Sequence, residues 1–150
     1  MISNIMIVDD SKIDLFVHQK VIEKYNSKIK INCYDNPLSA LNSIKASNSA
    51  ENSKAIEIPD VILLDVNMPQ MNGFKFIEDL KKIEVPAKKR IEVFMLSSSR
   101  YFKDIHRAKK NSACSGYISK PLTLEKLKEI EKQVMIKKDC LITQFFLSLV

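Results

Sequence analysis

The sequence lacks the features that indicate a disulfide framework or a zinc site. Its three cysteines, Cys33, Cys114 and Cys140, form no CxxC pair and lie near no histidine cluster. Unpaired cysteines are typical of a reducing compartment, so we expect a cytoplasmic protein. The two histidines, His18 and His106, are isolated from each other, and we expect each to lie on a helix surface rather than to bind a ligand.

Long apolar runs and basic clusters rich in aromatic residues are also absent. No stretch reaches the roughly 20 apolar residues that a membrane span needs, and residues 1–8 do not resemble a signal peptide. The net charge of +6 comes mostly from lysines that are grouped near expected helix ends. A nucleic-acid surface favours arginine with interleaved aromatic residues. We therefore expect neither a membrane span nor a nucleic-acid partner.

The chain contains five short apolar segments that alternate with segments of helical spacing. Its 150 residues are enough for one domain with a single core. We expect strands over residues 5–8, 29–34, 61–65, 91–96 and 116–119. We expect helices over residues 11–26, 37–44, 73–83 and 101–110, and a last helix that begins near Thr123. This alternation predicts an α/β fold with a parallel sheet and helices on both faces. The polar segment 47–57 is expected to be a mobile surface loop.

The first predicted helix has both a start signal and a candidate buried face. Ser11 to Asp14 is typical of a capping box, which opens a helix. Apolar residues then recur at helical spacing, and we expect them to face the core. They are Ile13, Phe16, Val17 and Val21.

Charged and polar side chains follow the predicted strands at their carboxyl ends. They are Asp9, Asp10, Asp65, Ser97 and Lys120. Because parallel strands end at one edge of a sheet, we expect these side chains to lie together. Three adjacent carboxylates repel one another and indicate a bound cation, for which Mg²⁺ is the natural candidate among oxygen ligands. A lysine and a hydroxyl nearby suit phosphate oxygens, so the pattern predicts phosphoryl transfer to Asp65.

These motifs, taken in order, resemble the receiver domain of two-component response regulators in its single-domain, chemotaxis-regulator-like form. The resemblance covers residues 3–135 and implies a flavodoxin-like (βα)5 three-layer sandwich, with a five-stranded parallel sheet in order 2-1-3-4-5. The motifs that carry it are Val8-Asp9-Asp10, Leu64-Asp65-Val66-Asn67-Met68-Pro69 with Asn72-Gly73, Leu96-Ser97 and Ser119-Lys120-Pro121.

The resemblance implies which residues accept the phosphoryl group and bind the metal. Asp65 would be the acceptor. Asp10 and Asp65 would bind Mg²⁺ (or Mn²⁺) directly, and Asp9 would act mainly through a metal-bound water. The backbone carbonyl of Asn67 would complete the protein ligands.

The resemblance also implies how the phosphoryl group would be held and sensed. Lys120 and Ser97 would contact its oxygens, and the peptide bond between Lys120 and Pro121 would be cis. Ser97 and Tyr117 would form the switch, because the hydroxyl would move toward the phosphoryl group and the ring would turn inward into the space that this movement leaves.

The function implied is that of a signalling receiver, which is no enzyme beyond its own Mg²⁺-dependent phosphorylation and dephosphorylation. The donor would be a phosphohistidine on a sensor histidine kinase or a histidine phosphotransfer protein, and the output would be binding to a downstream protein. One alternative is an Asp-nucleophile phosphatase of haloacid-dehalogenase type, a family that has a second acid where this chain has Asn67. A flavin binder, whose phosphate Asp9 and Asp10 would repel, and a phosphorylation-independent interaction domain are the others.

The end of the chain departs from the family pattern. We divide the chain into a receiver domain, residues 1–138, and an apolar C-terminal tail, residues 139–150, which we expect to continue the last helix. An apolar stripe of this kind needs a cover. The tail could fold back on its own domain, pair with a second copy through the last helix and tail, or bind a partner or a membrane surface. The apolar residues of the tail are Leu141, Ile142, Phe145, Phe146, Leu149 and Val150.

Overall fold

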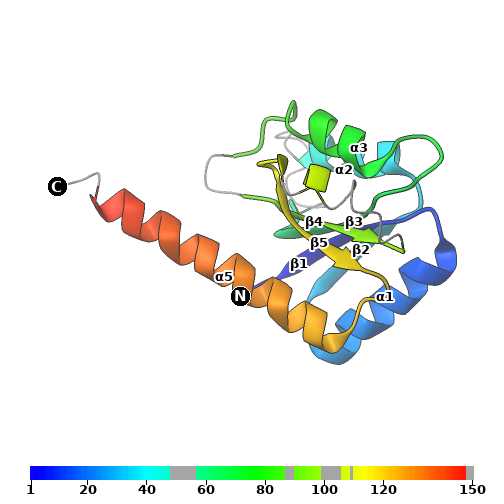
Figure 1. Ribbon diagram of the computed structural model, residues 1–150, viewed down its shortest axis with the longest axis horizontal. Helices are drawn as coiled ribbons and strands as arrows, with labels where there is room; N and C mark the ends of the chain where they lie inside the picture. The colour runs from blue at the N-terminus through cyan, green and yellow to red at the C-terminus, as the bar shows by residue number, and fades with distance from the viewer. Residues whose placement is uncertain (48–56, 87–89, 99–105, 109, 148–150) are drawn as a thin grey trace.

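The computed structural model describes residues 1–47, 57–86, 90–98, 106–108 and 110–147, and these contain a five-stranded parallel sheet. The strands are β1 (Asn4–Val8), β2 (Lys30–Tyr34), β3 (Val61–Asp65), β4 (Glu92–Ser97) and β5 (Cys114–Ser119). Their order across the sheet is β2-β1-β3-β4-β5 (Figure 1). The predicted strand order and the flavodoxin-like fold are therefore confirmed.

Helices cover both faces of this sheet. They are α1 (Lys12–Tyr25), α2 (Pro37–Ser47), α3 (Gly73–Leu80) and α5 (Leu124–Leu147). The helices α1 and α5 lie side by side on one face, and α2 and α3 lie on the other (Figure 1). The three-layer arrangement predicted from the alternating segments is thus present.

Two apolar layers form the core, one on each side of the sheet. Along β1, Ile5 and Ile7 pack with residues of α1 and α5, whereas Met6 and Val8 pack with residues of α2 and α3. All five residues of β1 and of β3 are buried. Successive side chains of a strand point to opposite faces, so a strand covered on both sides needs an unbroken apolar sequence. This requirement explains why these two strands were visible in the sequence.

The buried face of α1 differs from the predicted one. Ile13, Phe16 and Val17 have 76%, 61% and 39% of their surface exposed. The residues that α1 buries are instead Leu15, His18 and Ile22. Both sets recur at helical spacing, so spacing alone cannot choose between them. The choice is made by the turn from β1 into the helix, which sets the rotation of α1 about its axis.

Helix α5 is bonded to the sheet at two separate places. Near its start, the ammonium group of Lys126 donates to the backbone carbonyls of Ser119 at 2.6 Å and Pro121 at 2.8 Å. Further along, the ammonium group of Lys137 forms an ion pair of 2.8 Å with Glu92, a buried residue at the start of β4. The helix is therefore fixed to both ends of the sheet.

Some predicted elements lie wholly or partly outside the described residues. Residues 106–108 and 110 are helical, but most of the helix expected over 101–110 is outside the description, as are residues 48–56 of the expected loop. Helix α5 runs to Leu147, so its backbone extends into the segment 139–150, and the division of the chain there stays a prediction. Among the described residues, no helix is both long and apolar enough to cross a bilayer.

Candidate functional site

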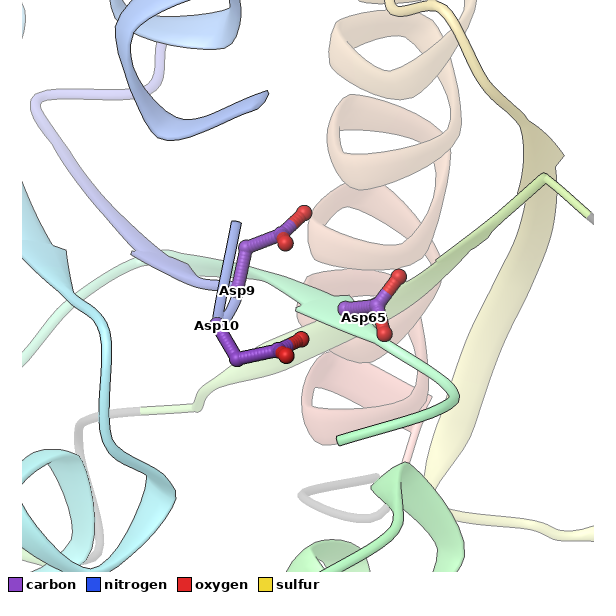
Figure 2. A group of neighbouring side chains, drawn as sticks. All are labelled: Asp9, Asp10 and Asp65. Carbon is purple, nitrogen blue, oxygen red and sulfur yellow. The ribbon is translucent and has the colours of Figure 1, made fainter. Parts of the chain in front are cut away.

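Three aspartates meet where β1 and β3 end. Asp65 is the last residue of β3, and Asp9 and Asp10 directly follow β1, its neighbour in the sheet. One carboxylate oxygen from each of the three lies within 4.8 Å of the others. Figure 2 shows the side chains of Asp9 and Asp10 pointing toward the side of the sheet where Asp65 lies. The sheet thus brings together residues that are 55 positions apart in the chain, as the sequence predicted.

Lys120 lies among these acids and binds three carboxylates at once. Its ammonium nitrogen is 2.6 Å from Asp9, 2.7 Å from Asp65 and 2.8 Å from Asp14. Burial alone would lower the pKa of this ammonium group, but its contacts with the three carboxylates outweigh burial and raise the pKa above its usual value. Lys120 is therefore a fixed positive charge at every physiological pH.

Asp9 is the most deeply buried of the three aspartates, with 1% of its surface exposed. One of its oxygens accepts from the backbone N–H of Ser11 at 3.0 Å, and the other accepts from Lys120. Burial raises the pKa of the Asp9 carboxyl, although the hydrogen bond from Lys120 opposes this, and the charge of Asp65 adds to it. Burial and the repulsion from Asp65 therefore leave a demand for further positive charge.

Asp65 combines a held orientation with access from the edge of the sheet. It is 6% exposed; one oxygen pairs with Lys120, and the other accepts from the backbone N–H of Asn67 at 2.8 Å. These two contacts fix the rotamer of the carboxylate. Asn67 itself is exposed and follows β3 by two residues.

The other predicted site residues come from β4 and β5. Ser97 is the last residue of β4, is 1% exposed, and accepts from the backbone N–H of Lys120 through its carbonyl at 2.9 Å. The Lys120–Pro121 peptide bond is cis. Tyr117 lies in β5 three residues before Lys120, is half-buried, and packs against the core layer on the side of α2 and α3. Ser97 and Lys120 therefore stand at the same edge as the aspartates, whereas Tyr117 stands behind it.

Two residues near the site were missed by the sequence reasoning. Asp14 was interpreted only as part of a capping box, and it binds Lys120. His18 was expected on the helix surface, and this prediction is wrong, because His18 is 1% exposed. The two residues are four positions apart, hence on one face of α1. A second helical stripe of Asp14, His18 and Ile22 was the available signal.

The protein is expected to lose stability as the pH falls below about 6.5, because His18 is buried as a neutral imidazole. Burial, and then the charge of Lys120, lowers its pKa from 6.5 to about 4. The unfolded chain therefore binds more protons between these values, and stability falls with pH through that window. Urea unfolding at pH 7 and pH 5 should show a loss of about 2 kcal/mol in wild type from this group. His18→Leu should lack that part of the loss, and an equal loss in both proteins would contradict the assignment.

The aspartate cluster has the composition of a site for a hard divalent cation. Its donors are carboxylate oxygens, with no sulfur or nitrogen ligand among them. Mg²⁺ and Mn²⁺ prefer such oxygen donors, and Mg²⁺ keeps several waters when few protein ligands are available. The raised pKa of Asp9 shows that the three carboxylates are not fully neutralised by Lys120. The residues present therefore fit such an ion.

The comparisons with known proteins agree with this geometry. The family model described as "Response regulator receiver domain" matches residues 5–132. A two-component response regulator from Cytophaga hutchinsonii has a similar structure, with a TM-score of 0.77, 27% identity, and coverage of 89% of this chain and 97% of that one. A response regulator receiver protein from Dyadobacter fermentans gives a TM-score of 0.74 and 32% identity, with coverage of 89% and 98%.

Curated relatives include much longer proteins. The Oryza sativa subsp. japonica protein named "Probable histidine kinase 6" is 24% identical over 148 residues, which are 89% of this chain and 14% of that protein. The chain spans less than half the length of the curated relatives it matches. The similarity is thus to one domain of those relatives.

Proposed function

Because this chain belongs to the family of response regulator receiver domains, we propose that it accepts a phosphoryl group on Asp65 and passes the signal on by binding another protein. The observation that carries the proposal is the contact of Lys120 with both Asp65 and Asp9 inside a cluster of three aspartates. A structural ion pair needs one acid for one base. Three clustered acids around one lysine instead suit a site that also receives a cation and an anion.

The chemistry follows from the residues that surround Asp65. An oxygen of its carboxylate attacks the phosphorus of a phosphohistidine, so an O–P bond forms while the P–N bond breaks, and the imidazole of the donor leaves with the electron pair and takes up a proton. Lys120 and the hydroxyl of Ser97 are placed to bind phosphoryl oxygens. The N–H of Asn67 keeps the carboxylate oriented. These groups act by position and charge, which is how phosphoryl transfer is accelerated.

A divalent cation would be held by Asp9, Asp10 and Asp65, with the backbone carbonyl of Asn67 as a further oxygen ligand. When bound, Mg²⁺ neutralises the negative charge that builds up on the transferred group. The carboxylate oxygens that support this assignment lie within 4.8 Å of one another.

Signalling would follow from the added charge at the edge of the sheet. Ser97 ends β4 and Tyr117 lies in β5, so the two residues of the switch belong to paired strands. A phosphoryl group that prefers one arrangement of Ser97 and Tyr117 by a few kcal/mol moves most of the population to it. The partners would be a sensor histidine kinase or phosphotransfer protein and a downstream protein in the cytoplasm. The chain would have no turnover other than its own phosphorylation and dephosphorylation.

The test is the intact mass of the protein after incubation with Mg²⁺ and acetyl phosphate. Wild type should gain one phosphoryl group, and this gain should be absent without Mg²⁺ and absent in Asp65→Asn. Asp79→Asn is the matched control, because Asp79 forms only surface ion pairs with Lys75 and Lys82. The control should be phosphorylated like wild type. An equal gain in Asp65→Asn would place the acceptor elsewhere, and no gain in wild type would reject the proposal.

A further inference from the structure

The carboxylate of Asp14 does not make the bond that its place in the helix would predict. In a capping box, the acid at the third helical position accepts from the backbone N–H of the capping residue. Here the hydroxyl of Ser11 accepts from the N–H of Asp14 at 3.2 Å, but the N–H of Ser11 donates to Asp9. The carboxylate of Asp14 is therefore free of the cap and reaches Lys120 at 2.8 Å.

Asp14 differs from the other two partners of Lys120 in its relation to the metal site. An ammonium group has three N–H donors, and Asp9, Asp14 and Asp65 can use all of them. Asp9 and Asp65 belong to the aspartate cluster, and Asp14 does not. Asp65 changes chemically when it is phosphorylated, and Asp9 would face the cation. Asp14 is therefore the one partner among these three that stays the same in every state of the site.

The charges point in the same direction. Burial of Lys120 disfavours its ammonium form, and the hydrogen bond with Asp14 is the largest of the contributions that raise its pKa, ahead of Asp65 and Asp9. The side chain of Asp14 is 36% exposed, whereas those of Asp9 and Asp65 are 1% and 9% exposed. Helix α1 thus supplies a carboxylate from the solvent side of the lysine, opposite the buried acids.

We propose that Asp14 is a positioning residue of the phosphorylation site, which holds the ammonium group of Lys120 from α1 so that one N–H stays directed at Asp65. The proposal rests on the proposed function of Asp65 and Lys120. A lysine side chain has many rotamers, and holding its charge in one place removes that freedom before the reaction. When Asp65 becomes an acyl phosphate, the N–H that it released faces the new phosphoryl oxygens, and the bond to Asp14 remains.

The experiment compares rates of phosphorylation by acetyl phosphate at saturating Mg²⁺ and donor. Asp14→Ala should lower the rate by about tenfold, because a group misplaced by about 1 Å loses much of its effect. Asp14→Asn should fall between the two, since its amide oxygen still accepts from the ammonium group without the charge. Glu23→Ala is the matched control, because it removes a negative charge from the same helix that contacts Lys20 and Gln19. The control should keep the wild-type rate.

The same substitution in a Lys120→Met background shows whether Asp14 acts through Lys120. Asp14→Ala should slow the reaction in wild type and have no further effect beside Lys120→Met, which a general weakening of α1 would not produce. Equal slowing in both backgrounds, or no slowing in wild type, would overturn the proposal.

The stability of the same four proteins separates this proposal from the proposed function. In Mg²⁺-free buffer, urea unfolding of wild type, both single variants and the double variant should give a coupling of about tenfold in the unfolding constant. If wild type takes no phosphoryl group but the coupling is present, the proposed function fails and the contact stands. If the coupling is absent, the positioning role is rejected whatever the phosphorylation result.

Discussion

Lys120→Met is expected to lower the free energy of unfolding by about 3–5 kcal/mol in Mg²⁺-free buffer, the range for removing one partner of a buried ion pair. The lysine side chain is 10% exposed, and its partners Asp9 and Asp65 are 1% and 9% exposed. Without the lysine, these carboxylates have no positive charge beside them. Urea unfolding at pH 7 measures the loss directly.

Two conditions should reduce this loss, and each has a stated physical cause. Saturating Mg²⁺ supplies the missing charge, and a ligand at a hundred times its dissociation constant adds about 3 kcal/mol. Lower pH should also help, because a carboxyl whose folded pKa is raised binds a proton more readily in the folded state, so stability rises as the pH falls toward that pKa. The gap between variant and wild type should therefore narrow with Mg²⁺ and between pH 7 and pH 5.

A surface lysine provides the control for Lys120→Met. Lys20 forms an ion pair of 2.7 Å with Glu23, and both side chains are more than one third exposed. Lys20→Met should cost less than about 1 kcal/mol and should not respond to Mg²⁺. A similar small loss for Lys120→Met would show that its three contacts are not formed in solution.

Gly73→Ala is expected to lower the free energy of unfolding by about 2–3 kcal/mol and to reduce phosphorylation of Asp65. A Cβ atom at Gly73 would lie 2.8 Å from the backbone carbonyl oxygen of Asp65 and 3.3 Å from the Cα of Val66. Both are backbone atoms, so relief requires the end of β3 to move. That movement would displace the acceptor carboxylate. The measurements are urea unfolding and the rate of mass gain with acetyl phosphate.

Gly116→Ala separates the steric effect from the effect on the site. A Cβ atom at Gly116 would lie 2.9 Å from the ring of Phe94, which is a side chain in the middle of β4. This variant should lose stability while Asp65 keeps its reactivity. If the two variants had the same phosphorylation rate, the close approach of Gly73 to Asp65 would have no role in shaping the site.

The sequence predicted most completely those elements whose environment is the same on both sides. Strand β3 has the predicted bounds, because a strand buried on both faces must be apolar throughout and Asp65 marks its end. The grouping of Asp9, Asp10 and Asp65 followed from the parallel direction of the strands. The strand order itself came from the family resemblance, since hydrophobic periodicity carries no information about which strands are neighbours.

The sequence could not predict how α1 is rotated against the sheet. Two stripes of residues share the helical spacing, and the more apolar one, which includes Phe16, lies outside. The stripe that faces inward includes Asp14 and His18, whose polar side chains made it appear to be the solvent side. Their burial is explained by Lys120, which arrives from β5, about 100 residues later in the chain, and no local pattern could reveal that contact.

The two attachments of α5 make this helix a lever. Lys126 binds the carbonyls of Ser119 and Pro121, which flank Lys120, and Lys137 is anchored to Glu92. At 1.5 Å per residue, the two points of attachment are about 16 Å apart, and the ten residues from Lys137 to Leu147 extend about 15 Å beyond the second one. A displacement of the loop that carries Lys120 therefore pivots α5 about Glu92 and reappears, reversed in direction and nearly equal in size, at the far end of the helix.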